Sequence, residues 1–209
     1  MAQVEFRVGV QQLQDGAQQP PRLGRAGELV SQDAHGRFYE AVYRGNVWGG
    51  SNPVAGVAPG TALATAGVPL GLYNPPGSGK NLVVLRSSAG YVSGTLGAGS
   101  IVYGAAAQAA NPTGGAQVTP KSNLLGNAAT GAGILWSGGT WTNAPAILRP
   151  AYTLGAFLAT TASFNPPLID EVAGEYIVTP GNYFALMGIA AAGTTPLMLF
   201  GLTWEEVPQ

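Results

Sequence analysis

The sequence predicts an all-β protein built as an antiparallel sandwich or barrel. The 209 residues include 32 glycines and 16 prolines, which is too many for long helices. No window shows a sustained apolar stripe at helical spacing, whereas short strand-like runs closed by Gly, Pro, Asn and Ser recur along the chain. A series of short strands separated by such turns is typical of β-sandwiches and barrels. At this length the chain can bury a sizeable core without a disulfide or a metal.

The first 27 residues differ in composition from the rest. A possible short strand at 4–10 is followed by the Gln-rich stretch 11–21, which ends in Pro20-Pro21 and has almost nothing to bury. Polar residues and paired prolines favour an extended chain over a packed one. We therefore expect residues 1–27 to form an extended N-terminal arm and residues 28–209 to form the folding unit.

The body begins with an alternating segment at residues 37–44. Tyr39, Ala41 and Tyr43 share one face there and Glu40 and Arg44 the other, which predicts a half-buried strand.

Further strands are expected along the rest of the body. Residues 81–86 are apolar on both faces, and this favours a central strand that runs on to Val92. The last two strands are expected to pair as a hairpin, and residues 205–209 to end in solvent. Residues 105–131 match no strand pattern. The strands are expected at 68–73, 81–92, 100–103, 133–136, 152–160, 175–178, 183–190 and 197–204, with turns at 74–79, 94–97 and 193–196.

Charge is scarce and unevenly placed. Only 9 basic and 10 acidic residues occur, or 9% of the chain against about 25% in an average domain. This fits either a monomer with a Ser/Thr/Asn/Gln surface or a surface covered by neighbouring subunits, where charge is depleted. The net charge of −1 and the lack of a basic stripe argue against nucleic-acid binding. The uncharged stretch 176–204 is interrupted by glycines and prolines, so no membrane span is expected.

The motifs that could carry chemistry are incomplete. The absence of cysteine excludes thiol redox chemistry and thiolate–zinc sites, and it fits a protein made in the cytoplasm. Residues 77–80, Gly-Ser-Gly-Lys, look like the end of a phosphate-binding loop. However, Asn74 stands where that motif needs glycine, Asn81 stands where it needs Ser or Thr, and a strand follows instead of a helix. We expect a glycine-rich turn.

The titratable residues do not complete a catalytic pattern either. His35 is the only histidine, which argues against a metal site, and no G-x-S-x-G accompanies a triad with Asp33 or Asp170. Asp170 and Glu171, with Glu175 nearby, could suggest a glycosidase pair, but neighbours in a strand face opposite ways and a solvated loop is expected. The sequence thus predicts no catalytic, cofactor-binding or metal-binding residue, and a protein that is not an enzyme.

Four tryptophans leave two interpretations open. Trp136 and Trp141 flank residues 137–140 and would lie at a hairpin tip or its base. The four indoles could stack on a sugar, or they could pack in a core or an interface, where tryptophan is enriched. The four are Trp48, Trp136, Trp141 and Trp204.

Three segments together resemble virion proteins of tailed bacteriophages: 71–82, which contains NPPGSGKNL, 94–104, and 174–183, which contains GEYIV. Over residues 65–205 the body resembles small jelly-roll proteins that decorate or cement phage capsids. The resemblance does not extend to a major capsid subunit, because this sequence shows neither the long helix nor the extended loop expected of one. It implies a jelly-roll-like antiparallel β-sandwich with no catalytic residues or cofactor.

The resemblance also implies partners and a location. These are the major capsid protein, further copies in a homotrimer, and a place on the capsid exterior of the virion. The alternative is a tail-associated or receptor-binding module whose tryptophan-bearing loops contact host glycan.

Overall fold

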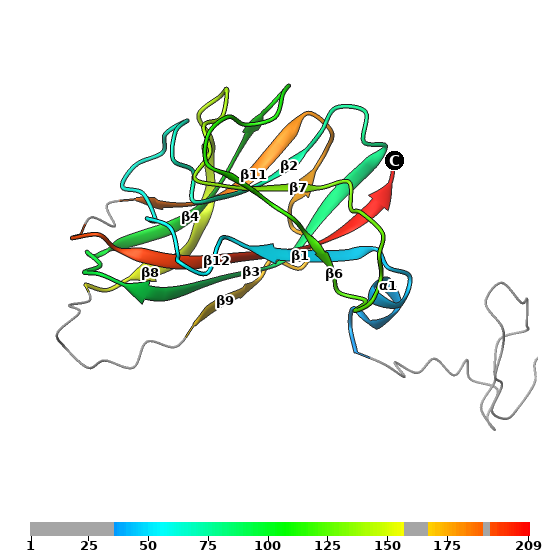
Figure 1. Cartoon of the computed structure of the whole chain (residues 1–209), viewed down its shortest axis with the longest axis horizontal. Helices are drawn as coiled ribbons and strands as arrows, with labels where there is room; N and C mark the ends of the chain where they lie inside the picture. The colour runs from blue at the N-terminus through cyan, green and yellow to red at the C-terminus, as the bar shows by residue number, and fades with distance from the viewer. Residues whose placement is uncertain (1–35, 157–166, 190–192) are drawn as a thin grey trace, which may run out of the picture. The chain divides into compact units, whose positions relative to one another are not determined.

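The computed structural model describes residues 36–156, 167–189 and 193–209 (Figure 1). The expected arm, its boundary at residue 28 and His35 lie outside the described residues. The chain divides after Glu40, and every strand belongs to the second unit, Ala41–Gln209.

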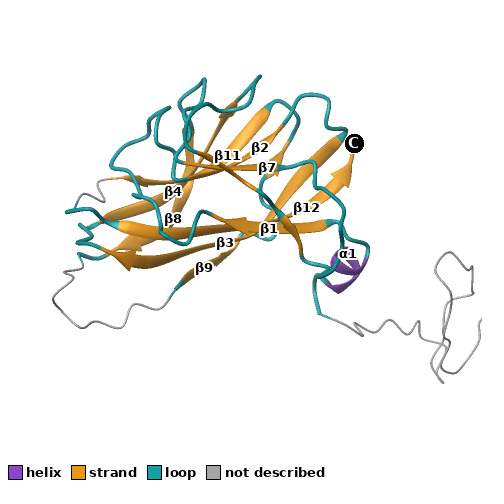
Figure 2. Ribbon diagram, viewed as in Figure 1, coloured by secondary structure: helices purple, strands orange, loops and turns teal. Residues whose placement is uncertain are grey.

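Two antiparallel six-stranded sheets make up this unit (Figure 2). Sheet 1 has the order β10 (Ile177–Val178), β3 (Lys80–Ser93), β12 (Leu197–Pro208), β1 (Val47–Ser51) and β6 (Lys121–Ser122), and β9 (Leu168–Glu171) also pairs with β3. Sheet 2 has the order β5 (Ala116–Val118), β7 (Ile134–Ser137), β2 (Leu70–Asn74), β11 (Asn182–Ile189), β4 (Gly99–Ala107) and β8 (Ala146–Leu154). The prediction of an all-β sandwich is confirmed.

The strands alternate between the sheets as in a jelly roll. Sheet 1 contains β1, β12, β3 and the edge formed by β9 and β10, while sheet 2 contains β2, β11, β4 and β8. Each of the first four strands therefore lies in the sheet opposite to the one before it, and β10, β11 and β12 alternate in the same way. This order is that of an eight-stranded jelly roll. The expected central position of residues 81–86 is also confirmed, since β3 lies between β12 and the β9–β10 edge.

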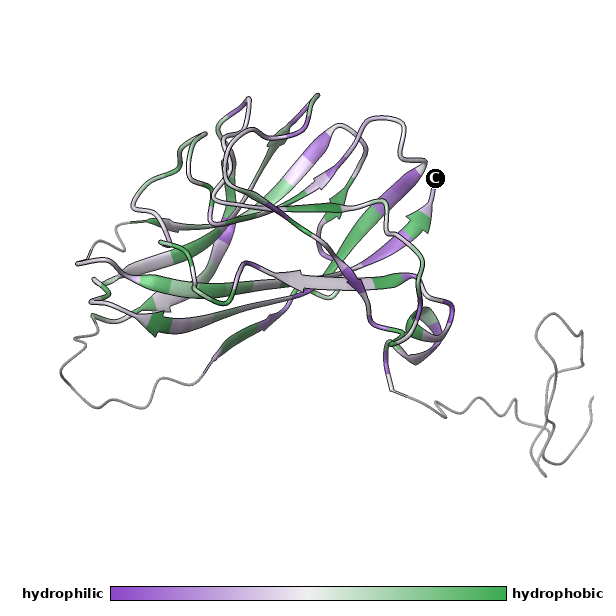
Figure 3. Cartoon of the chain, in the orientation of Figure 1, coloured by the Kyte–Doolittle hydropathy of each residue, from purple (hydrophilic) through white to green (hydrophobic). Residues whose placement is uncertain are grey.

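The main core lies between the inner faces of the sheets. Along β12, Met198, Phe200, Leu202 and Trp204 are buried in alternation with half-buried residues that face outward. Leu72 and Phe184 of sheet 2 belong to the same core cluster. Period-two alternation is what one buried face requires of a strand, and strongly hydrophilic residues form only short patches along the strands (Figure 3).

A second apolar cluster covers the outer face of sheet 2. Tyr73, Val102 and Tyr183 point to that side and pack with Val68 and Trp141 from the loops. The two loops hold each other, because the Trp141 amide donates to the Thr65 carbonyl at 2.8 Å and the Gly138 amide donates to the Val68 carbonyl at 2.8 Å. The outer face of sheet 2 is therefore covered by this chain's own loops.

Residues 108–145 extend both sheets. They overlap most of residues 105–131, which match no strand pattern in the sequence. They contribute β5 and β7 to sheet 2 and β6 to sheet 1, beside β2 and β1 respectively. The strand expected at 133–136 is confirmed as β7, whereas β5 and β6, of three and two residues, are too short for a sequence period to reveal them. We call residues 108–145 the insertion. The insertion closes one side of the sandwich, and β8 with β9 and β10 forms the other side.

The predicted strand at residues 37–44 is wrong, since the chain forms the helix α1 (Tyr39–Tyr43) there. No residue of α1 is buried, so the alternation had no core to face. Gly45, with φ of 73°, ends the helix: its amide donates to the Val42 carbonyl and the Asn46 amide donates to the Ala41 carbonyl. These two bonds form a Schellman motif, and the glycine supplies the left-handed conformation that the motif needs.

The predicted hairpin of the last two strands is also wrong. β11 pairs with β2 and β4 in sheet 2, whereas β12 pairs with β3 and β1 in sheet 1. The connection from β11 to β12 crosses from sheet 2 to sheet 1. The Thr194 carbonyl in this connection accepts a hydrogen bond from the amide of Thr95, which lies in the connection from β3 to β4. A turn signature marks a reversal but not the sheet that the next strand joins. The expected solvated end is confirmed for residues 207–209, which are exposed, but not for Glu206, which is buried, and β12 continues to Pro208.

Candidate interaction surface

The outer face of sheet 1 is not covered by the described loops in the way that the outer face of sheet 2 is. Its central residues are small, because Gly201 of β12 lies between Ser88 of β3 and Ser51 of β1, and Thr203 lies between Arg86 and Gly49. We call this surface the open face and define it by Ser51, Arg86, Ser88, Gly201, Thr203 and Lys121. Besides Arg86 and Lys121, this face carries Glu171, which pairs with Arg86, and Glu205, which follows Thr203 on the same side of β12.

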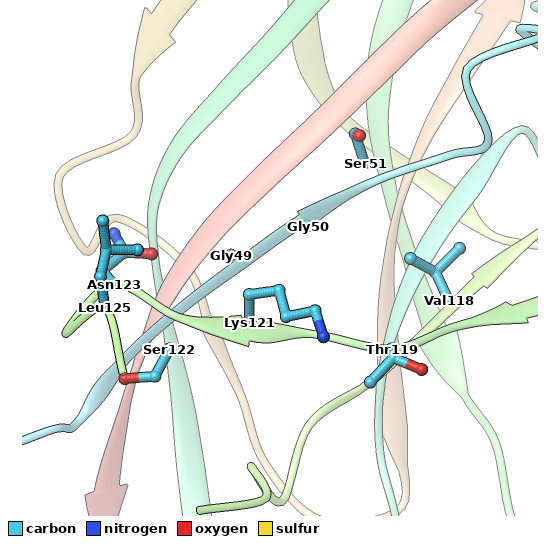
Figure 4. A pocket seen from close by; sticks show the side chains of 9 residues that line it. All are labelled: Gly49, Gly50, Ser51, Val118, Thr119, Lys121, Ser122, Asn123 and Leu125. Carbon is cyan, nitrogen blue, oxygen red and sulfur yellow. The ribbon is translucent and has the colours of Figure 1, made fainter. Parts of the chain in front are cut away.

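Two shallow hollows of about 610 and 220 Å³ lie along this face and share Gly50 and Ser51. In Figure 4 the side chain of Lys121 extends along β6 in the larger hollow, while the glycines of β1 add no side chain. Leu125 also lines the larger hollow and is 90% exposed. No aromatic side chain lines either hollow, so the hollows suit an extended protein surface better than a stacked sugar ring.

A second surface adjoins the open face where Ile169 and Glu171 of β9 lie beside Ser88 and Arg86 of β3. It continues along the side of the sandwich away from the insertion, where β8 is the last strand of sheet 2 and β9 and β10 form the border of sheet 1. Four large aliphatic side chains are exposed on these strands. We call this surface the edge surface and define it by Ile147, Leu148, Ile169 and Ile177. A hollow of about 300 Å³ lined by Leu148, Ile177 and Phe184 opens on it.

The charged residues of the edge surface neutralise one another. Arg149 donates to Asp170 at 2.8 Å and to Glu175 at 3.1 Å, and Arg86 pairs with Glu171 at 2.5 Å. The Arg149 guanidinium also lies 4.8 Å from the centre of the Tyr103 ring. Asp170 and Glu171 belong to β9, so the solvated loop expected from the sequence is wrong. The prediction that they face opposite ways stands, because Asp170 is bonded to the inner Tyr103 and Glu171 to the exposed Arg86.

Beneath Arg149 a buried chain of hydroxyl groups joins the two sheets. Tyr103 donates to Asp170 at 2.6 Å, and the Ser87 hydroxyl lies 2.5 Å from Tyr103 and 2.6 Å from Tyr152. Because Tyr103 has one proton and gives it to Asp170, Ser87 donates to Tyr103 and Tyr152 donates to Ser87. Burial raises the pKa of Tyr103, and its bond to Asp170 raises the pKa further; burial also raises the pKa of Tyr152. These hydroxyls are all engaged in holding the sheets together.

The turn at residues 74–80 uses its polar groups internally. Asn74 is fully buried, and its amide donates to the carbonyls of Lys80 at 2.8 Å and Val178 at 2.7 Å. Ser78 donates to the Asn74 side chain at 2.6 Å, and Gly77 and Gly79 have the positive φ that the turn requires. The segments 71–82 and 174–183 thus meet at this corner, and the predicted glycine-rich turn is confirmed.

We expect Lys80→Ala to leave nucleotide binding unchanged, with no heat from ATP in calorimetry for either protein. The turn offers no helix N-terminus to receive a phosphate, because β3 begins at Lys80. Micromolar ATP binding that disappears in Lys80→Ala would contradict this prediction.

Three of the four tryptophans are core residues. Trp48 and Trp204 belong to the main core, and Trp141 stacks on Tyr183 with ring centres 4.1 Å apart. The fourth, Trp136, is half-buried and donates to the Gly114 carbonyl at 2.7 Å. The structure therefore does not bring the four indoles together on a surface, and it favours packing over the sugar-stacking interpretation.

Within the described ranges, no three His, Cys, Asp or Glu side chains cluster closely enough to hold a metal ion. None of the helices among these residues has the length and apolar character needed to cross a membrane.

The residues of the edge surface were not singled out from the sequence. The strand expected at 152–160 begins at Ala146 in the structure, and its first residues include Ile147 and Leu148. Pro150 within this strand was the available signal, since proline in a strand marks a sheet edge. No family model, curated protein or solved structure matches the chain.

Proposed function

We propose that the protein decorates a phage capsid and stabilises the head shell by binding across subunits of the major capsid protein on the outside of the particle. The observation that supports this function best is the open face. It is a broad sheet surface with small residues at its centre, where Ser51, Gly201 and Ser88 lie side by side on β1, β12 and β3. Small residues let a partner surface approach a sheet closely, and charge is depleted at the centre of protein interfaces.

The mechanism is stabilisation by binding, with no chemical step. A protein that binds the assembled shell and not its dissociated subunits stabilises the shell by about 2.7 kcal/mol per site at a concentration one hundred times Kd. In this proposal the sandwich supplies the contact surface and residues 1–27 supply an arm that orders on the shell. Homotrimeric association belongs to the same proposal.

Shells that lack this protein provide the test. We expect the full-length protein to sediment with such shells and to raise the temperature at which they fall apart. We expect a chain of residues 28–209 to fold with a similar unfolding midpoint but to sediment less, because an ordered arm adds contact area that folding does not use.

Three results would count against the proposal. If the full-length protein fails to sediment with shells, decoration is wrong. If it binds host cells instead, the receptor-binding alternative replaces decoration. Equal sedimentation of the two chains would show that the arm is dispensable, and failure of the shorter chain to fold would place residues before 28 in the sheet.

A further inference from the structure

We propose that the edge surface is the contact between copies of this chain, and that the copies meet through side chains and not through paired strands. The inference deepens the proposed self-association and rests on it. It assigns that association to Ile147, Leu148, Ile169 and Ile177, on the side of the sandwich opposite the insertion.

Aliphatic exposure is concentrated on this side. Ile147, Leu148, Ile169 and Ile177 are 49%, 41%, 59% and 56% exposed, and all four lie on β8, β9 or β10. These three strands hold nine, four and two residues. Monomeric soluble proteins rarely expose contiguous apolar patches larger than a few hundred Å², and larger ones usually mark a binding surface.

The backbone of β8 is poorly suited to pairing with another strand. Pro150 has no amide proton, and the register with β4 shifts twice, between Ile101 and Val102 and between Tyr103 and Gly104. Proline and bulges are the devices that protect sheet edges from open-ended pairing. In the second shift Leu148 is the extra residue, placed between Ile147, which faces Gly104, and Arg149, which faces Tyr103. This bulge breaks the hydrogen-bond ladder between β8 and β4 and places Leu148 in the lining of the hollow on the edge surface.

Charge favours a second copy as the occupant. The cations of this side are Arg149, paired with Asp170 and Glu175, and Arg86, paired with Glu171. A strongly acidic or basic partner would therefore find no unpaired opposite charge to bind. A second copy presents the same neutralised pairs and aliphatic side chains, so association brings apolar surfaces together with little repulsion.

The shape of the edge surface also matches itself. The hollow of about 300 Å³ lies among Leu148, Tyr176, Ile177 and Phe184, and exposed Ile147 and Ile169 stand on the same side. Projecting side chains of one copy can fill the hollow of the next. A contact between two different patches generates a ring when the rotation closes, which is how a trimer is built.

The test measures the mass of the free protein without shells, by light scattering during size-exclusion chromatography over a range of concentrations. We expect the wild type to form a closed oligomer and the double variant Ile147→Asp/Ile177→Asp to need at least tenfold higher concentration to associate. Both substituted side chains are about half exposed, so urea unfolding of the variant should remain close to that of the wild type. Val54→Asp and Leu125→Asp, at positions 87% and 90% exposed but off the edge surface, serve as matched controls that keep the wild-type mass.

A second measurement does not depend on an aspartate variant that folds. The chain has no cysteine, so Ile177→Cys and Val54→Cys each introduce a unique thiol. We expect maleimide to label Cys at position 177 more slowly as protein concentration rises, and position 54 at a constant rate. A monomeric wild type, a double variant of unchanged mass, or equal labelling at both positions would overturn the assignment. None of these results depends on sedimentation with shells. If the edge surface proves not to be the contact between copies, the shell experiment still tests decoration independently.

Discussion

Replacing Glu206 with alanine should lower the free energy of unfolding by about 3–5 kcal/mol, because it strands several buried donors at once. The Glu206 carboxylate is 6% exposed and accepts the amides of Ala132 and Gly133, both at 2.9 Å. It also accepts the indole N–H of Trp204 at 3.3 Å. Bonds to a charged acceptor contribute roughly 1.5–3 kcal/mol each, and donors left without a partner retain their desolvation cost.

These bonds hold the insertion against the end of β12. Glycines allow the approach: a Cβ at Gly133 would lie 2.9 Å from Trp204 Nε1, and one at Gly131 would lie 2.8 Å from Glu206 Oε1. We therefore also expect Gly133→Ala to destabilise the fold, by a smaller amount than Glu206→Ala.

Urea unfolding followed by tryptophan fluorescence measures the effect. Glu205→Ala is the matched control, since the neighbouring side chain faces the opposite side of β12 and is only half-buried. Glu206→Gln should fall between the two, because its amide keeps one acceptor oxygen and places a donor against donors. If Glu206→Ala and Glu205→Ala unfold at the same urea concentration, Glu206 does not anchor the insertion.

Stability should also fall steeply above about pH 10. Burial raises the pKa of Tyr73, Tyr103, Tyr152 and Tyr183 in the folded chain. Below the pKa of an unfolded tyrosine both states hold the proton, so pH has no effect through these groups. Above it the unfolded chain releases protons that the folded chain keeps, and unfolding becomes easier. Each tyrosine contributes up to about 1.4 kcal/mol per pH unit, and the four together up to about 5.6 kcal/mol per unit.

Urea unfolding at about pH 8 and about pH 10.5 tests this slope. Tyr73→Phe is the sharpest variant, because the Tyr73 hydroxyl is buried with no hydrogen-bond partner among the residues described. At about pH 8 it should unfold no more easily than the wild type, and it should gain up to about 1 kcal/mol.

At about pH 10.5 Tyr73→Phe should lose less stability than the wild type does. Tyr183→Phe should show the same smaller loss but start from a lower stability, because the Tyr183 hydroxyl donates to the Asn143 carbonyl at 2.7 Å. An identical fall in the wild type and both variants would show that other groups control alkaline unfolding.

The fold class and the long strands could be predicted from the sequence, because apolar and polar residues alternate along a strand that buries one face. The alternation at 197–204 and the apolar run at 81–86 are of this kind. Strand pairing was harder, because the turn signature at 193–196 has the same residues whether the chain turns back in one sheet or crosses to the other. Residues 37–44 alternate in sequence but bury no side chain, so the period alone could not separate strand from helix.

The surface residues could be predicted least. Exposure of Ile147 or Ile177 depends on which strands lack a neighbour, and that depends on pairings between distant segments. The same holds for Glu206, which lies near the C-terminal end of the chain but is buried against residues 131–133. By contrast, the failure of Gly77–Lys80 as a phosphate loop followed from single residues, Asn74 and Asn81, and needed no tertiary information.

The position of β12 has a consequence for synthesis on the ribosome. This strand lies between β1 and β3, yet the ribosome makes it after every other strand of the sandwich. Until it emerges, β1 and β3 have no common neighbour and the apolar side of sheet 1 stays open. Sheet 2 can pair beforehand, whereas sheet 1 must wait, so the nascent chain passes through a half-sandwich that exposes Leu82 and Val84 and invites aggregation. A stop codon anywhere before Leu197 would leave the chain in that state.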